Sequence, residues 1–161
     1  MPKPRVYAET TIPSFYYDFR NSPGVVERRE ITRQWWADAA EGYELITSSV
    51  ALQELSAGTR QDLVRLRTEL LTDVPVVYTN PLILAIVREY LRHKLMPSKP
   101  TTADAAHLAL ASYHQCEFLL TWDSRHLANP NKSTHIQRVN SALGLHVPKI
   151  VTPAELLRRS G

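Results

Sequence analysis

Short apolar segments alternate along the chain with longer segments in which apolar residues recur every three to four positions. The short segments predict β-strands at 5–8, 43–47, 117–121 and 149–151, and a weaker edge segment at 74–78 that Pro75 interrupts. The longer segments predict helices at 25–40, 50–56, 60–71, 82–94 and 104–114, and a last one from Pro153 onward. Because strands and helices alternate, we expect an α/β fold: a three-layer α/β/α sandwich with a short, mostly parallel sheet.

Residues that favour the start of a helix precede several of the predicted helices. They are Thr10 or Thr11 with Pro13, Ser48 or Ser49, Asn80 with Pro81, and Thr101 or Thr102. A hydroxyl or amide oxygen at such a position can accept a hydrogen bond from a free backbone amide of the first turn. These residues therefore support the predicted helix boundaries.

Length and composition favour one compact domain spanning residues 1–161. The chain has 161 residues, 43% of them hydrophobic and 22% charged, with no repeat or linker that would divide it. Its single cysteine, Cys116, excludes an internal disulfide and is expected to be a small buried apolar residue. The longest apolar run, 82–87, is too short to span a membrane, and no signal peptide is recognisable. We therefore expect a cytoplasmic protein without a membrane segment.

The charge and the glycine content narrow the possible ligands. A net charge of +3 and a sequence pI near 9.1 permit binding to a polyanion without requiring it. The basic stretch from Arg88 to Lys99 could contact nucleic-acid phosphates or could be a solvated face. The five glycines form no P-loop and no GxGxxG or GxSxG motif. Common nucleotide-binding enzymes of the α/β class are therefore disfavoured.

Four acidic residues recur where the predicted elements meet. Glu9 and Asp123 follow strands, whereas Glu54 and Asp104 are expected within about the first turn of helices. In a parallel sheet, ligands bind beyond the carboxyl ends of the strands, so the four side chains can meet there. Carboxylates gathered in this way repel one another unless a cation lies between them, and Mg²⁺ or Mn²⁺ prefers such oxygen ligands. An ion of this kind acidifies water for attack on a phosphodiester.

Taken one at a time, the same residues have simpler interpretations. Asp104 could complete a capping box, Glu54 could be a surface residue, and Asp123 could cap a turn. His107 shares a helix face with Asp104 and is expected to pack behind or beside the site. His126 could approach a substrate phosphate or be a partly buried cap residue. The metal hypothesis therefore depends on the four acids meeting.

Four segments carry a resemblance to a known family. VYAETTIPSFY, SSVALQEL, TTADAAHLALA and LLTWDSRHLANP resemble, in this order, the four acidic motifs of PIN-domain ribonucleases, and look closest to VapC-type toxins. The resemblance implies the α/β/α sandwich and assigns metal binding and catalysis to Glu9, Glu54, Asp104 and Asp123. Thr121 matches the hydroxyl residue that often precedes the last acid by two positions. It would hold a metal-bound water or a phosphate.

The resemblance also implies an activity and partners. It implies a Mg²⁺- or Mn²⁺-dependent endoribonuclease acting on RNA, held in check by a protein antitoxin, and we expect a homodimer. The aromatic residues Phe15, Tyr16, Trp35 and Trp36 could form the antitoxin groove, a dimer interface or core. Glu9 departs from the usual aspartate, so a catalytically weak module that binds RNA or protein stays an alternative. Further alternatives are a DNA nuclease or a phosphohydrolase with the same metal.

Overall fold

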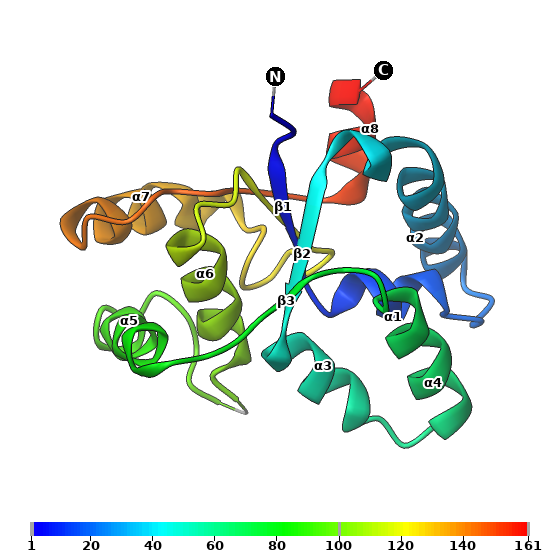
Figure 1. Ribbon diagram of the computed structural model, residues 1–161, viewed down its shortest axis with the longest axis horizontal. Helices are drawn as coiled ribbons and strands as arrows, with labels where there is room; N and C mark the ends of the chain where they lie inside the picture. Colours follow the sequence, from blue (N-terminus) through cyan, green and yellow to red (C-terminus); the bar gives the residue numbers. More distant parts are fainter. Residues whose placement is uncertain (1, 100, 161) are drawn as a thin grey trace.

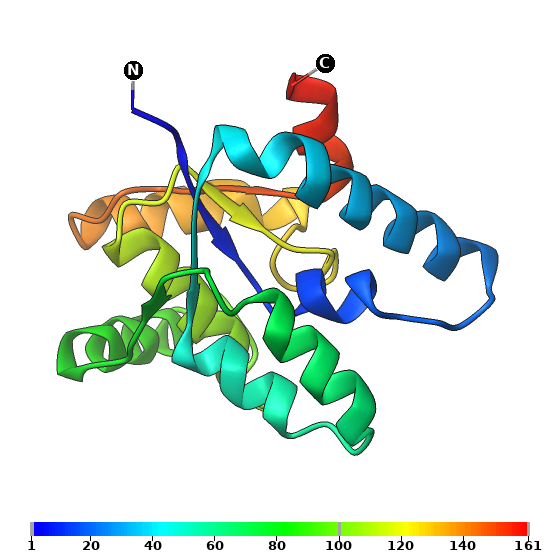
Figure 2. The ribbon, with the colours of Figure 1, turned by 45° about the vertical axis from the view of Figure 1, so that its right-hand side comes forward.

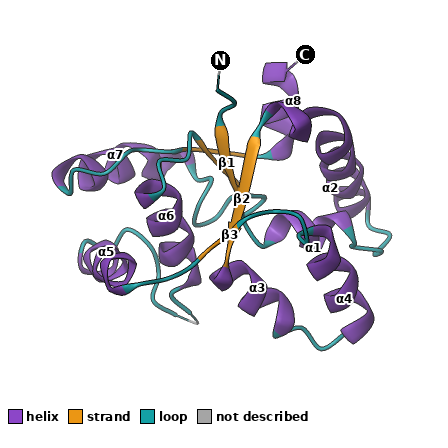
Figure 3. Cartoon of the chain, viewed as in Figure 1, coloured by secondary structure: helices purple, strands orange, loops and turns teal. Residues whose placement is uncertain are grey.

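A five-stranded parallel sheet forms the centre of the protein (Figures 1 and 3). The computed structural model describes residues 2–99 and 101–160, so the predicted domain limits 1 and 161 lie outside the described residues. The strands are β1 (Arg5–Ala8), β2 (Glu44–Ser48), β3 (Val76–Val77), β4 (Phe118–Leu120) and β5 (Lys149–Val151). Their order is β3-β2-β1-β4-β5, which confirms the predicted parallel sheet with a short edge strand after Pro75.

The order of the strands reverses beside β1. The chain first adds β2 and β3 on one side of β1 and then crosses to the other side, where it adds β4 and β5. The crossing runs through α5 (Pro81–Arg92) and α6 (Ala103–Tyr113). The carboxyl ends of β1 and β4 therefore lie at the point where open α/β sheets bind their ligands.

Two layers of helices cover the sheet (Figure 2). Tyr7, Ile46 and Leu119 belong to a core shared with α5, α6 and α7 (Ser133–Ala142). The opposite face contributes Val6, Phe118 and Leu120 to a second core. That core includes Trp35 and Leu156, from the π-helical turn Trp35–Ala39 that continues α2 (Pro23–Gln34) and from α8 (Pro153–Ser160). This alternation of faces along the strands confirms the three-layer sandwich.

Three further helices lie toward the carboxyl end of the sheet, in the lower part of Figure 1. They are α1 (Thr11–Tyr16), α3 (Ser49–Ser56) and α4 (Gln61–Leu70). A separate small core of Leu55, Leu71 and Val74 joins the ends of α3 and α4. Helices α1 and α3 border the place where the four acids were expected, because α1 begins at Thr11 beside Glu9 and α3 carries Glu54. No helix of the described chain is both long and apolar enough to cross a membrane.

Several predicted caps form and others do not. Ser48 accepts a hydrogen bond from the Ala51 amide at 3.2 Å and Asn80 accepts one from the Ile83 amide at 2.9 Å. Thr10 and Thr102 occupy the N-cap positions of α1 and α6, but neither side chain caps the helix. At α6 the predicted alternative forms, because the Thr101 hydroxyl accepts from the amide of Ala103, the first residue of the helix, at 3.2 Å. The hydroxyl of Thr10 is used in the functional site instead.

Helix α7 is an element that the sequence analysis did not predict. It follows a 3₁₀ turn, Pro130–Lys132, and buries Ile136 and Val139 against the core of α5 and α6. Its apolar residues do recur at helical spacing, but polar residues dominate the segment and no side chain caps its start.

Candidate metal centre

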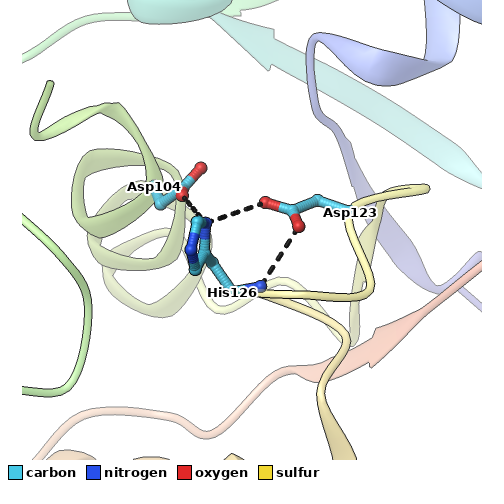
Figure 4. Close-up of side chains that lie close together, drawn as sticks. All are labelled: Asp104, Asp123 and His126. Carbon is cyan, nitrogen blue, oxygen red and sulfur yellow. Dashed lines mark hydrogen bonds and ion pairs between the residues drawn. The ribbon is translucent and has the colours of Figure 1, made fainter. Parts of the chain in front are cut away.

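Three side chains meet beyond the carboxyl end of β4 (Figure 4). The Nδ1 atom of His126 lies 3.1 Å from a carboxylate oxygen of Asp104 and 3.8 Å from one of Asp123. Among the described residues, these three form the one group of acids, histidines and cysteines whose ligand atoms all lie within 4.8 Å of one another. Each side chain is partly exposed, so solutes can reach the group.

A tight turn after β4 positions Asp123. The amide of Asp123 donates to the Thr121 hydroxyl at 2.9 Å, and one Asp123 carboxylate oxygen accepts from the amides of Arg125 and His126 at 3.0 and 3.1 Å. Asp123 therefore caps a turn, as its simpler interpretation suggested. The second carboxylate oxygen is the one that faces His126. Thr121 is fully buried and acts on the site through Asp123.

Asp104 enters the site from the second residue of α6. Helix α6 consists largely of small residues, and its residues from Ala105 to Ser112 are all buried. The helix can therefore pack closely in the core, and this packing fixes the direction of its first turn. Burial, followed by the negative charge of Asp123, raises the pKa of Asp104. Because burial and the neighbouring Asp123 both disfavour the charged form of Asp104, a cation between the two carboxylates would stabilise them.

Glu54 faces the same region from α3 but lies beside the group of three. It is the sixth of eight residues in α3, which corrects the expectation that it lies in about the first turn. One of its carboxylate oxygens accepts from the Thr10 hydroxyl at 2.5 Å and from His107 Nε2 at 2.6 Å. Burial would raise the pKa of Glu54, but the hydrogen bond and charge of His107 lower it overall.

A buried chain of hydrogen bonds supports Glu54. His107 Nδ1 lies 2.6 Å from the Tyr7 hydroxyl, which lies 2.6 Å from the Ser48 hydroxyl. All three side chains are fully buried. Because an ionised Glu54 only accepts, Nε2 of His107 donates to it, and in the neutral ring Nδ1 accepts from Tyr7. His107 thus lies behind Glu54, with both ring nitrogens engaged.

Glu9 is buried at the end of β1 and is held by the start of α1. It has 4% of its surface exposed, and one carboxylate oxygen accepts from the Thr11 amide at 2.7 Å and from the Thr11 hydroxyl at 2.5 Å. The same hydroxyl accepts from the Trp122 amide at 2.8 Å, which links Glu9 to the turn after β4. Burial raises the pKa of Glu9, although the charge of His107 and the bonds from Thr11 act in the opposite direction.

The predicted residues therefore gather in one region as two neighbouring groups. Asp104 and Asp123 meet at His126, whereas Glu9 and Glu54 are each held by a threonine of the TT pair that follows β1. The charge of Glu54 raises the pKa of both Asp104 and Glu9, so the two groups interact electrostatically. Sequence reasoning missed Tyr7, Thr10 and Thr11. Their position beside Glu9 in YAETT was the available signal.

The donor atoms fit a divalent cation. Carboxylate oxygens suit Mg²⁺ and Mn²⁺, and an imidazole nitrogen is a common ligand of transition metals. Asp104, Asp123 and His126 would hold such an ion. Glu9 and Glu54 each keep a second carboxylate oxygen for which no hydrogen bond is recorded within the described chain, and these oxygens can bind waters around the ion.

Fold and site define an α/β protein with a carboxylate-rich candidate cation site at the switch point of a parallel sheet. A family model for the PIN domain matches residues 25–132, so the chain belongs to the PIN domain family. The match includes Glu54, Asp104 and Asp123, and Glu9 lies before it. The comparison with curated proteins gives no match.

Solved structures share the fold at low sequence identity. The VapBC2 complex from Rickettsia felis bound to a promoter DNA fragment is 11% identical, with a TM-score of 0.59 over 92% of this chain and 98% of that one. A toxin-antitoxin complex from Klebsiella pneumoniae is 17% identical, with a TM-score of 0.56 over 92% and 97%. VapC20 from Mycobacterium tuberculosis, a sarcin-ricin loop cleaving toxin, is 17% identical, with a TM-score of 0.59 over 78% and 95%. The fold is thus that of VapC toxins, which confirms the resemblance.

Proposed function

We propose that the protein is a divalent-metal-dependent endoribonuclease, formed by a single domain over residues 1–161. The observation that carries this proposal is the meeting of Asp104, Asp123 and His126 within 4.8 Å, at the switch point of a PIN-domain sheet. Similarity of fold to a sarcin-ricin loop cleaving toxin supports the same substrate class. Mg²⁺ or Mn²⁺ is the proposed cofactor.

Each residue has a role in this mechanism. A divalent ion in this site would lower the pKa of a coordinated water and offset negative charge on the phosphate. Asp104 and Asp123 would bind the ion directly, and Glu9 and Glu54 would orient waters through their second oxygens. Thr11 and His107 would keep those two glutamates in place. Thr121 would act by positioning Asp123 through its backbone amide.

A ribonuclease assay tests this proposal. Purified protein is expected to cleave single-stranded RNA with Mg²⁺ or Mn²⁺ and to lose the activity in excess chelator. Asp104→Asn should reduce the rate at least about 100-fold, because it removes a charged ligand. Asp73→Asn, on an exposed turn, is the matched control and should retain full activity. Equal cleavage by wild type and Asp104→Asn would reject the mechanism.

Burial of Glu9 favours one alternative, a catalytically weak binding module. The raised pKa and the bonds to Thr11 would both weaken its interaction with a cation. Such a module would bind RNA but would not cleave it when either Mg²⁺ or Mn²⁺ is present. Parallel assays with single-stranded DNA and a small phosphate ester distinguish the ribonuclease from a DNA nuclease or a phosphohydrolase.

We also propose that the protein is a cytoplasmic toxin with a cognate antitoxin. Similarity of fold to two toxin-antitoxin complexes supports such a partner. A cavity of about 560 Å³ near α1 and α4, lined by Phe15, Phe19 and three arginines among others, is a candidate binding surface. Trp35 is fully buried and belongs to the core instead. Inducible expression should arrest growth, and co-expression of a co-encoded antitoxin should restore it.

A homodimer is part of the same proposal. Tyr78, Leu82 and Leu84 are large apolar residues with about half or more of their surface exposed, at or near the start of α5. Large exposed apolar side chains favour association. Light scattering during gel filtration would measure the oligomer, and a dimer should dissociate when Leu82 and Leu84 are both changed to Ser.

A further inference from the structure

His126 lies between the two aspartates of the metal centre, as Figure 4 shows. Its Nδ1 atom faces both carboxylates, at 3.1 Å from Asp104 and 3.8 Å from Asp123. A histidine in this position can contribute a lone pair to an ion that the aspartates bind. The four acidic residues would not supply such a nitrogen.

A hydrogen bond of the His126 backbone holds this residue beside Asp123. Its amide donates to Asp123 at 3.1 Å, in the same turn that positions the Asp123 carboxylate. The backbone of His126 and the carboxylate of Asp123 are therefore held close to each other within one four-residue turn. The His126 side chain is 36% exposed, so an ion can reach the ring from solvent.

The other histidine of this region is not available to a metal. His107 is fully buried, and its two ring nitrogens are engaged by Glu54 and Tyr7 at 2.6 Å each. Breaking either bond would leave a buried polar group without a partner, which is energetically costly. His126 is thus the histidine whose nitrogen faces the open part of the site.

The distances suit ligands of one ion. With metal–ligand bonds of about 2.1 Å, neighbouring ligand atoms lie about 3 Å apart in octahedral geometry and about 3.4 Å apart in tetrahedral geometry. The separations of 3.1 and 3.8 Å from Nδ1 need only small side-chain adjustments to reach these values.

We propose that His126 is a direct nitrogen ligand and that it makes the centre selective for Mn²⁺ over Mg²⁺. The inference rests on the proposed function and specifies its metal. Mg²⁺ takes oxygen ligands almost exclusively and keeps several waters, whereas an imidazole suits ions of the first transition row. A set of two carboxylates and one imidazole should therefore bind Mn²⁺ more tightly than Mg²⁺.

Pulsed electron paramagnetic resonance on the Mn²⁺-loaded full-length protein tests for the nitrogen directly. The wild type is expected to show the ¹⁴N coupling of a bound imidazole, which becomes a ¹⁵N coupling when histidine is ¹⁵N-labelled. His126→Gln should lose the coupling and weaken Mn²⁺ binding about tenfold in calorimetry, with less than about twofold change for Mg²⁺. His93→Gln, at an exposed position after α5, is the matched control and should behave as wild type.

The outcomes separate this inference from the proposed function. If Mn²⁺ binds and Asp104→Asn abolishes binding, but the wild type shows no nitrogen coupling, His126 is not a ligand and the metal-dependent nuclease stands. Equal weakening of Mn²⁺ and Mg²⁺ by His126→Gln would overturn the selectivity. Absence of any carboxylate-dependent Mn²⁺ binding would overturn both proposals.

Discussion

At the scale of single residues, the site is organised by side chains that are not themselves acidic. Thr10 and Thr11 each engage one oxygen of a glutamate, and His107 engages Glu54 from behind. Fixing one oxygen leaves the other with a defined direction, which reduces the ordering needed when a ligand binds. The cost is that each of these polar groups depends on its neighbours for its hydrogen bonds.

Tyr7→Phe should show this dependence. The change removes a hydroxyl that contacts both Ser48 and His107, and leaves two buried polar groups without that partner. We expect a loss of about 1–3 kcal/mol in the free energy of unfolding, measured by urea denaturation. Tyr113→Phe, at a position with 38% of its surface exposed, should change stability by less than about 0.5 kcal/mol. Similar values for the two variants would contradict a structural role for the Tyr7 hydroxyl.

The pH dependence of stability in chelator should report the buried acids. The folded-state pKa of Asp104 and of Glu9 is raised, so each acid favours the folded state most when it is neutral. That contribution is fully present below the ordinary pKa of a carboxyl group and is lost as the pH rises through the raised value. Asp104→Asn should therefore unfold at a temperature about 2–4 °C above wild type near neutral pH. Thermal denaturation at several pH values should show this difference disappear in acid.

At the scale of elements, the starts of helices explain how the acids are aimed. Asp104 lies in the first turn of α6, and Glu54 lies in the second turn of α3, whose start Ser48 caps. The hydroxyl of Ser48 also contacts Tyr7, so one residue belongs to both the cap and the site. The start of α6 is held by the hydroxyl of Thr101, which accepts from the Ala103 amide at 3.2 Å, and by the small side chains with which the helix packs in the core.

Two capping positions provide a matched comparison. Asn80→Ala removes a side chain that accepts a 2.9 Å bond at the start of α5, and should cost about 1 kcal/mol of stability. Thr102→Ala changes the corresponding position of α6, where the side chain makes no capping bond, and should cost much less. Chemical denaturation of both variants measures the difference. A larger loss for Thr102→Ala would reject the assignment of the caps.

At the scale of the whole molecule, the sheet topology brings the acids together. Glu9 and Asp123 follow adjacent parallel strands that are far apart in the sequence, and the crossover through α5 and α6 returns Asp104 to the same edge. Gathering carboxylates in this way is unfavourable without a cation, so the fold and the ligand should stabilise each other.

Binding of Mn²⁺ should therefore raise the thermal stability of the wild type. At 100 times the dissociation constant, a ligand that binds only the folded state adds about 2.7 kcal/mol. For a protein of this size, this corresponds to about 5–10 °C in the melting temperature. Differential scanning fluorimetry should show the shift in wild type and in Asp73→Asn, but not in Asp104→Asn. A shift of equal size in Asp104→Asn would indicate that the ion binds elsewhere.

Much of the fold was predictable because its signals are local. Each strand is a short apolar segment, and Ser48 and Asn80 mark their helices by residue type. Helix α7 was missed because its few apolar residues become significant only when Ile136 and Val139 meet the core of α5 and α6. The acids of the candidate site were named from their positions at the ends of elements. Their division into two groups was not predictable.

The sequence by itself determined the alternation of strands and helices, the family and the acids that face one edge of the sheet. The alternation and the acids follow from periodicity and residue type, which are local properties of the chain, and the family follows from the resemblance of four motifs. Only the tertiary structure decided which atoms meet. Tyr7 and His107, 100 positions apart, form one buried chain, and His126 rather than Glu9 joins the two aspartates. Hydrogen bonds over such separations depend on how the layers pack, and no local pattern records that packing.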